Sequence, residues 1–139
     1  MTTRTLHASS VAVDGKGLLI LGPSGSGKSA LALRLMALGA VLIADDRTVL
    51  DLSPQGVVLR CPPNLSGLIE ARGIGILHAP ALAEARLDLV VDLGTPEPDR
   101  LPPRRSIVLL GRSHDLVYAS PGDHFPAAVL YYLRHGRQA

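Results

Sequence analysis

The stretch GLLILGPSGSGKSALALRLMALGAVLIADD, residues 17–46, holds a glycine-rich loop between apolar segments and ends in two adjacent aspartates. The loop satisfies the pattern G-x-x-x-x-G-K-[ST] through Gly22, Gly27, Lys28 and Ser29. The run GLLIL before it is typical of a buried strand, and the longer apolar segment after it is typical of a helix. This order of strand, loop and helix predicts a phosphate-binding loop.

The predicted loop would bind phosphate mainly through its backbone. Its glycines allow successive N–H groups to point inward, and the following helix adds the positive end of its dipole. Lys28 is expected to reach the outermost phosphates, and the Ser29 hydroxyl is expected to hold Mg²⁺. The candidate nucleotide-binding residues are Gly22, Pro23, Ser24, Gly25, Ser26, Gly27, Lys28 and Ser29. The alternative is a turn rich in Gly and Ser that matches by chance.

Asp45 and Asp46 follow the apolar run AVLIA, the pattern of a strand that delivers a carboxylate beside the loop to organise Mg²⁺. The run LDLVVD, which ends at Asp92, fits the same pattern. Neighbouring side chains of a strand point in opposite directions, so the two adjacent aspartates could have different tasks. One could face the metal while the other receives a proton from an attacking hydroxyl. The alternative is that both end the strand and solvate its turn.

Apolar runs elsewhere in the chain predict an α/β fold. The expected strands are residues 10–13, 17–21, 40–44, 56–60, 87–93, 106–111 and 116–120. Helices are expected at 29–38, ending before Gly39, and at 125–134, where Asp123 could cap the first turn; a weaker helix is expected at 80–86. Asp14-Gly15 between the first two runs indicates a tight hairpin. A hairpin implies a mixed sheet rather than an all-parallel one.

The length and organisation of the chain predict one domain, residues 1–139. No internal repeat is found. The segment GTPEPDRLPPRR, residues 94–105, carries four prolines and no periodicity, which predicts a long loop that is functional or mobile. Aromatic residues make up only 3% of the sequence, so the core is expected to consist of aliphatic side chains.

Composition and charge exclude several classes of protein. The N-terminus has no apolar signal segment and no run is long enough to span a membrane, so a cytoplasmic protein without a membrane partner is expected. The single cysteine, Cys61, excludes an internal disulfide and fits a reducing compartment. The net charge is only +2, and the basic residues are scattered without interleaved aromatics. This pattern argues against a nucleic-acid partner.

The five histidines offer no metal site from spacing alone. His7 precedes the first predicted strand, and its spacing does not place it near the aspartates. His78, His114, His124 and His135 are weaker candidates, and none of the five has metal-ligand spacing with a cysteine or an acid.

Two motifs together resemble the catalytic domain of the HPr kinase/phosphorylase family; HPr is the histidine-containing phosphocarrier protein of the sugar phosphotransferase system. HASSVAVDGKGLLILGPSGSGKSALALRLMALGAVLIADD, from His7 to Asp46, matches the first motif without a gap. LIEARGIGIL, residues 68–77, is similar to the second, a glutamate followed by Arg-Gly-hydrophobic-Gly. The resemblance covers most of residues 6–93.

The resemblance implies roles that the residues alone do not assign. Asp45 matches the family's general base, with His7 against it, while Asp46 and Glu70 match the metal environment beside Ser29. Arg72, Gly73 and Gly75 fall in the signature associated with the reverse reaction, in which inorganic phosphate releases pyrophosphate. The fold is expected to resemble the nucleotide-binding domain of phosphoenolpyruvate carboxykinase, and the family forms hexamers. ATP, Mg²⁺ and the HPr phosphocarrier are the implied cofactors and partner.

The chain also departs from the family pattern. On this resemblance the family's usual N-terminal domain is expected to be absent, and Arg100 in PDRL is expected to match a flexible, arginine-bearing loop that takes part in dephosphorylation. FPAAVLYYLRH matches a shortened form of the family's partner-contacting helix. The resemblance therefore implies an ATP-dependent protein-serine kinase that acts on HPr, with phosphorolysis as a second activity. The alternatives are a module that senses nucleotide or phosphate without transferring phosphoryl groups, and a kinase that acts on a small molecule.

Overall fold

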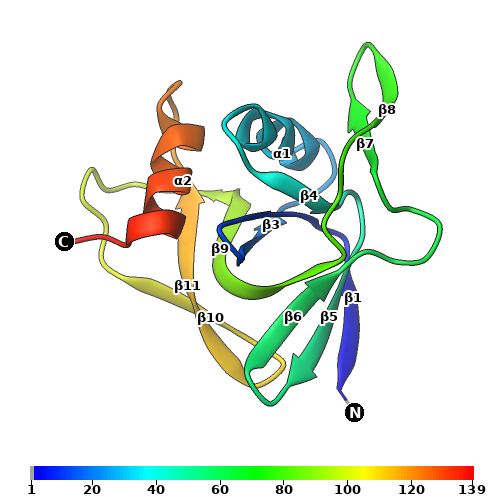
Figure 1. Cartoon of the computed structure of the whole chain (residues 1–139). Coiled ribbons are helices and arrows are strands. Elements are labelled where there is room, and N and C mark those ends of the chain that lie inside the picture. The colour runs from blue at the N-terminus through cyan, green and yellow to red at the C-terminus, as the bar shows by residue number, and fades with distance from the viewer. Residues whose placement is uncertain (1) are drawn as a thin grey trace.

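The computed structural model describes residues 2–139, in which nine strands form one mixed sheet and two form a separate hairpin (Figure 1). The large sheet contains β1 (Thr3–Leu6), β2 (Ser9–Val13), β3 (Lys16–Leu21), β4 (Val41–Ala44), β5 (Thr48–Ser53), β6 (Gly56–Arg60), β9 (Glu84–Pro96), β10 (Arg105–Leu109) and β11 (Arg112–Ala119). The hairpin consists of β7 (Leu68–Ala71) and β8 (Gly75–His78). The two helices are α1 (Lys28–Ala37) and α2 (Phe125–His135).

The strand order of the large sheet is β1-β5-β6-β9-β3-β2-β4, and the β10–β11 hairpin joins it through β9. β3 and β11 both pair with β9 in parallel, whereas the other pairs are antiparallel. The predicted α/β class with a mixed sheet is confirmed. The hairpin predicted at Asp14-Gly15 also forms between β2 and β3, and both residues have positive φ, 52° and 76°. Two positive φ angles are the signature of the turn that suits strand twist.

Hydrophobic side chains fill both faces of the sheet. Because neighbouring residues of a strand point to opposite faces, Leu18 and Ile20 of β3 pack beneath the helices, against Leu31 and Leu35 of α1. Leu19 faces the other way, into a second core that β5, β6, β9 and β10 help to close. Burial on both faces explains why the strand segments read as continuous apolar runs.

The two helices lie next to each other on one face of the sheet (Figure 1). α1 is followed by Gly39 with φ of 109°, as expected for a helix C-terminus. The cap predicted for α2 is wrong, because no side chain caps its first turn. His124 stands at the N-cap with helical backbone angles (φ −74°, ψ −15°), which places Asp123 outside the first turn. No helix within residues 2–139 is long and apolar enough to cross a membrane.

The helix predicted at 80–86 is wrong. Residues 84–86 pair with β6 as the first residues of β9. Just before them, the Leu82 N–H donates to the Leu42 carbonyl of β4 at 2.8 Å. The alanine-rich composition of this segment favours a helix, but backbone bonds to two strands override that weak preference. β1, β5, β7 and β8 were not predicted.

The loop predicted at 94–105 is shorter than expected, because β9 continues to Pro96 and the irregular part is 97–104. An ion pair closes the base of this loop. Arg105 donates to both carboxylate oxygens of Glu97 at 3.0 Å, which lowers the pKa of the Glu97 carboxyl group.

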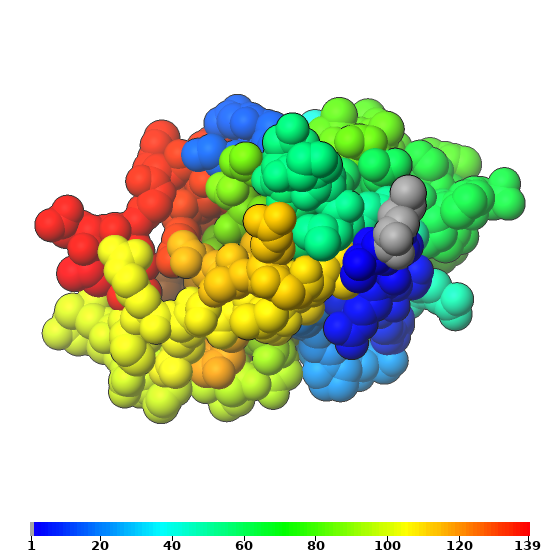
Figure 2. Space-filling view, turned by 90° about the horizontal axis from the view of Figure 1, so that it is seen from below, coloured from blue at the N-terminus to red at the C-terminus, as the bar shows by residue number. Residues whose placement is uncertain are grey.

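The loop 97–104 is also tied to the C-terminal tail, residues 136–139. Arg104 donates to the Arg137 carbonyl at 3.0 Å, and Arg137 donates to the Pro102 carbonyl at 2.6 Å. Figure 2 shows the yellow loop beside the red tail. Reciprocal bonds of this kind give the proline-rich loop a fixed path.

Candidate functional site

Residues 22–27 connect β3 to α1 in a loop whose conformation requires glycine at three positions. Gly22, Gly25 and Gly27 have φ of 150°, 81° and 97°, which side-chain-bearing residues rarely adopt. Space is a second limit at Gly22, where a Cβ would lie 2.4 Å from Ser26 Oγ. The Ser26 N–H closes the turn by donating to the Pro23 carbonyl at 3.1 Å. The loop leads directly into the N-terminus of α1, the arrangement of a phosphate-binding loop.

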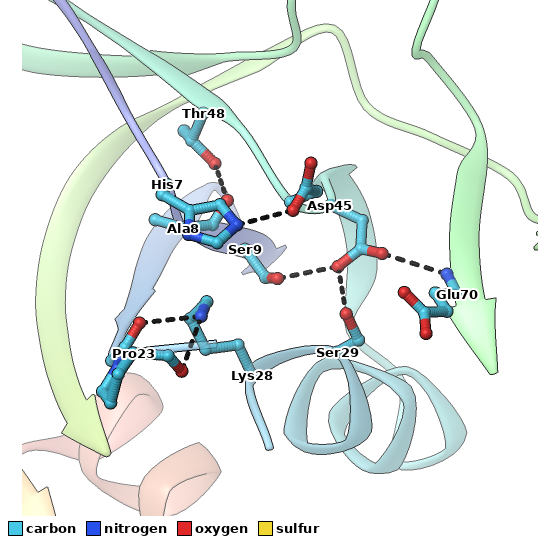
Figure 3. Close-up of polar contacts among 11 residues, drawn as sticks. His7, Ala8, Ser9, Pro23, Lys28, Ser29, Asp45, Thr48 and Glu70 are labelled. Atoms are coloured by element: carbon cyan, nitrogen blue, oxygen red, sulfur yellow. Dashed lines mark hydrogen bonds and ion pairs between the residues drawn. The ribbon is translucent and has the colours of Figure 1, made fainter. Parts of the chain in front are cut away.

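Lys28, the first residue of α1, lies folded back over this loop (Figure 3). Its ammonium donates to the Gly22 carbonyl at 2.7 Å and to the Pro23 carbonyl at 3.2 Å. The residue is only 7% exposed. A full positive charge is therefore held against the loop, where it can interact with a bound phosphate chain.

Asp45 follows β4 directly; it is buried and accepts three hydrogen bonds (Figure 3). Its Oδ1 accepts from Ser29 Oγ and from Ser9 Oγ, both at 2.7 Å. Its Oδ2 accepts from the Glu70 backbone N–H at 3.0 Å. The carboxylate thus lies beside the first turn of α1 and is fixed by donors from three elements.

Asp46 points elsewhere, because its Oδ1 lies 2.7 Å from His7 Nε2 and the two side chains are 63% and 51% exposed. The expected contact between His7 and Asp45 is therefore wrong. β4 ends at Ala44, so strand alternation does not set these directions. The chain instead turns, with the Arg47 N–H donating to the Asp45 carbonyl at 2.7 Å and with φ of 66° at Asp46. This turn sends one carboxylate toward the loop and the other to the surface.

Asp92, the other acid that ends an apolar run, is occupied by its own strand. Its Oδ1 accepts from the Gly94 N–H at 2.8 Å and its Oδ2 accepts from Thr95 Oγ1 at 3.2 Å. A Cβ on Gly94 would lie 3.0 Å from the Pro23 side chain, so this turn of β9 packs against the phosphate-binding loop. The position of Asp92 supports the loop, and Asp45 is the acid that contacts Ser29.

Three other predicted residues are placed differently from one another. Glu70 lies on β7 next to Asp45, and its carboxylate points from β7 toward Ser29 (Figure 3). Arg72 is exposed at the turn between β7 and β8. Arg100 is exposed on the loop 97–104 and lines a cavity of about 180 Å³ between that loop, β11 and α2. Among the described residues, no hydrogen bond or ion pair links either arginine to the aspartates.

The family of the chain follows from these residues. A family model described as the HPr Serine kinase C-terminal domain matches residues 1–100. The chain belongs to this family. The matched region contains the phosphate-binding loop, both aspartates and the β7–β8 hairpin, whereas β10, β11 and α2 lie beyond it.

Relatives in the HPr kinase family include longer proteins and a solved structure. The chain is 39% identical over 97 residues to the HPr kinase/phosphorylase of Cupriavidus metallidurans, covering 64% of this chain and 30% of that protein. It is 40% identical over 99 residues to that of Bordetella pertussis, covering 66% and 32%. The chain thus spans about a third of the length of these relatives. The Hpr(Ser) kinase/phosphatase structure from Coxiella burnetii matches with a TM-score of 0.80 and 25% identity, over 94% of this chain and 88% of that one.

Three buried hydroxyls of the domain were not predicted from the sequence. Ser9, Ser10 and Thr48 are completely buried. Ser9 donates to Asp45, as described above, while Ser10 Oγ lies 3.0 Å from Thr48 Oγ1, which donates to the Ala8 carbonyl at 3.0 Å. Two adjacent serines at the start of an apolar strand could have signalled this network, because buried hydroxyls require partners.

Replacing Ser9 by alanine is expected to lower the free energy of unfolding by about 1.5–3 kcal/mol, because its hydroxyl bonds a carboxylate. Ser10→Ala is the matched control, since it removes a bond between two neutral hydroxyls, which contributes about 0.5–1.5 kcal/mol. Urea unfolding of both variants and the wild type at neutral pH measures the difference. An equal or larger loss in Ser10→Ala would show that the bond to Asp45 is not the stronger one.

The oxygen donors beside the loop are of the type that Mg²⁺ prefers. Ser29 and Asp45 present oxygen donors within one hydrogen bond of each other, and Mg²⁺ prefers oxygen ligands. In the part of the chain that the structure describes, no group of three or more His, Cys, Asp or Glu side chains is arranged to hold a metal. An ion that takes one or two ligands from the protein and the others from phosphates and water fits this donor set.

Proposed function

We propose that the chain is an ATP-dependent protein-serine kinase that phosphorylates the HPr phosphocarrier and also phosphorolyses the product with inorganic phosphate. The observation that carries the proposal is the divergence of Asp45 and Asp46. Asp45 contacts Ser29 of the phosphate-binding loop, while Asp46 lies at the surface against His7. A module that only binds nucleotide needs the first arrangement, whereas a phosphotransferase also needs a base that its acceptor can reach.

The donor side of the site consists of the loop, Lys28, Ser29 and Asp45. In this proposal backbone N–H groups of the loop hold the phosphate chain, and Lys28 compensates the charge of its outer phosphates. Ser29 and Asp45, with Glu70 as the neighbouring carboxylate, are the residues that would hold Mg²⁺. When bound, Mg²⁺ offsets the charge that develops on the phosphate oxygens.

We assign the general base to Asp46, which interchanges the roles that the family resemblance implied for the two aspartates. Asp45 is 8% exposed and accepts three hydrogen bonds, so an incoming hydroxyl has poor access to it. Asp46 is exposed, and only its Oδ1 is engaged. Its Oδ2 is left to receive a proton, and His7 holds the orientation of the group.

The proposed transfer is a direct displacement. The serine oxygen of HPr attacks the γ-phosphorus of ATP, the bond from that phosphorus to the β–γ bridging oxygen breaks, and Asp46 takes the serine proton. ADP leaves. In the reverse direction, an oxygen of inorganic phosphate attacks the phosphoserine phosphorus after losing its proton to Asp46. Pyrophosphate forms as the bond from that phosphorus to the serine oxygen breaks, and the serine oxygen regains its proton from the same carboxyl group.

Incubation with labelled ATP, Mg²⁺ and the cognate phosphocarrier is expected to place label on one serine of the carrier. A carrier with that serine replaced by alanine is the matched control and should stay unlabelled. Tight ATP binding without label on any carrier residue would refute the kinase and favour the nucleotide-sensing module.

The reverse reaction is expected to be weak, because Arg100 lines a separate cavity rather than the phosphate-binding loop. An arginine placed away from the reacting phosphate contributes little to stabilising its charge. Pyrophosphate release from phosphorylated carrier at high phosphate can be followed by a coupled assay. Phosphoserine lost as phosphate alone would mean hydrolysis, and a carrier that stays phosphorylated would leave only the kinase.

We further propose a homo-hexamer in the cytoplasm, as the family resemblance implies. The β7–β8 hairpin supports an assembly because Ile74 and Ile76 are 79% and 62% exposed. Apolar side chains this exposed are typical of contact surfaces. Light scattering of the purified chain measures its mass, and a monomer at micromolar concentration would contradict the hexamer.

A further inference from the structure

A groove of about 340 Å³ lies beside the phosphate-binding loop, on the side away from the catalytic acids. It is lined by Ser26 and Gly27 of the loop, by Ala30 and Arg34 of α1, and by Asp123 and Phe125 at the start of α2. Its volume falls at the lower end of the range for small-molecule sites, about 300–1,000 Å³. The cavity near Arg100 is a different one.

The order of the strands separates the groove from the acids. β3, which leads into the loop, lies between β9 on one side and β2 and β4 on the other. Asp45 and Asp46 follow β4, whereas the groove is lined by Leu93 of β9 and by residues of α2. Figure 3 shows the same separation, with Asp45 and Glu70 on one side of the loop and β9 and α2 on the other. A triphosphate in the loop therefore has one end toward the acids and its other end toward the groove.

We propose that this groove binds the nucleoside of the phosphoryl donor, with Arg34 and Asp123 as its polar recognition groups. This inference rests on the proposed function, because it identifies the part of ATP that lies outside the loop. Within residues 2–139, neither side chain forms a hydrogen bond or an ion pair with the rest of the protein. A guanidinium and a carboxylate without protein partners are available for the base and for the ribose hydroxyls.

The groove also offers an apolar surface and a buried hydroxyl. Phe125 is the one phenylalanine in the chain, and it is half-buried at the groove wall, where a planar base could pack against it. Ser26 Oγ is buried and has no hydrogen-bond partner among the described residues. A buried hydroxyl without a partner is costly. A ligand that passes from the loop into the groove would supply that partner.

The test compares Mg-ATP with inorganic tripolyphosphate, which has the phosphates but no nucleoside, by calorimetry. The wild type is expected to bind ATP more tightly than tripolyphosphate. Asp123→Ala and Arg34→Ala should each lower ATP affinity by about tenfold or more, the effect of losing a bond to a charged group. Tripolyphosphate affinity should stay unchanged in both. Asp123→Ala should fold normally, because Asp123 does not cap α2.

Asp99→Ala and Arg112→Ala are matched controls, since both residues are exposed and neither lines the groove. They should leave both affinities unchanged. If Asp123→Ala and Arg34→Ala bind ATP as tightly as the wild type, the groove does not hold the nucleoside. A wild type that binds ATP no more tightly than tripolyphosphate also refutes the groove as the nucleoside site. The kinase activity is tested separately by the labelling assay. If the wild type binds neither ATP nor tripolyphosphate, both the nucleoside site and the proposed function are refuted.

Discussion

Lys28→Ala is expected to abolish phosphoryl transfer and to weaken ATP binding by about ten- to hundredfold. The Lys28 ammonium is held at the loop by two backbone carbonyls and is the only side-chain cation with a bond to the loop among the described residues. Its loss removes a charge-assisted contact to the outer phosphates. This contact contributes to ATP affinity and also stabilises the transition state of phosphoryl transfer. Calorimetry measures the affinity, and carrier labelling measures the transfer.

Lys16→Ala is the matched control, because the chain has only two lysines and Lys16 donates to the Arg134 carbonyl at 3.0 Å, away from the loop. It should bind ATP like the wild type. Lys28→Ala should also weaken the binding of tripolyphosphate, whereas Arg34→Ala and Asp123→Ala should not. Unchanged ATP affinity in Lys28→Ala, with the fold intact by circular dichroism, would refute the loop as the phosphate site.

Asp46→Asn is expected to slow transfer by about 10²–10⁴-fold while Mg-ATP binding is retained. The amide keeps the shape of the side chain but cannot take the serine proton, so the change falls on turnover. Asp45→Asn should act differently, because Asp45 bonds Ser29 and lies on the donor side. It should raise the Mg²⁺ concentration that half-saturates the reaction. Transfer rates measured across a Mg²⁺ titration separate the two effects.

The opposite pattern would restore the roles that the resemblance implied. If Asp46→Asn transfers at the wild-type rate and Asp45→Asn loses turnover with unchanged Mg²⁺ dependence, then Asp45 is the base. Both variants replace a carboxylate by an amide at adjacent positions, so each serves as the control for the other.

The phosphate-binding loop could be predicted from sequence because its information is local. Three glycines, a lysine and a serine at fixed spacing determine the backbone of residues 22–29, and the apolar runs on either side determine the strand and the helix. The hairpin at Asp14-Gly15 is local in the same sense. The continuous apolar runs agree with the two cores that the structure shows, because such runs are typical of a sheet covered on both faces.

The contacts of the aspartates could not be predicted, because they depend on distant segments. The contact between Asp46 and His7 depends on the pairing of β1 with β5, because β1 directly precedes His7. β1 has no apolar pattern in the sequence. The positive φ of Asp46 is a further determinant that residue type does not reveal. The helix prediction for residues 80–86 failed for the same reason, because pairing with β6, a strand distant in sequence, determines the conformation of residues 84–86.

The pairing of β9 with both β3 and β11 affects when the phosphate-binding loop becomes rigid during folding. β9 pairs with β3 over residues 86–92, and its residues 89–92 also pair with β11, near the end of the chain. Parallel pairs of this kind join segments distant in sequence, so they form late and slowly. β9, which lies beside the strand that leads into the phosphate-binding loop, therefore gains its full set of neighbours only after β11 has docked. Loop, groove wall and C-terminal segment should open and close as one cooperative unit, so a destabilising change in β11 would loosen nucleotide binding at the other end of the sequence.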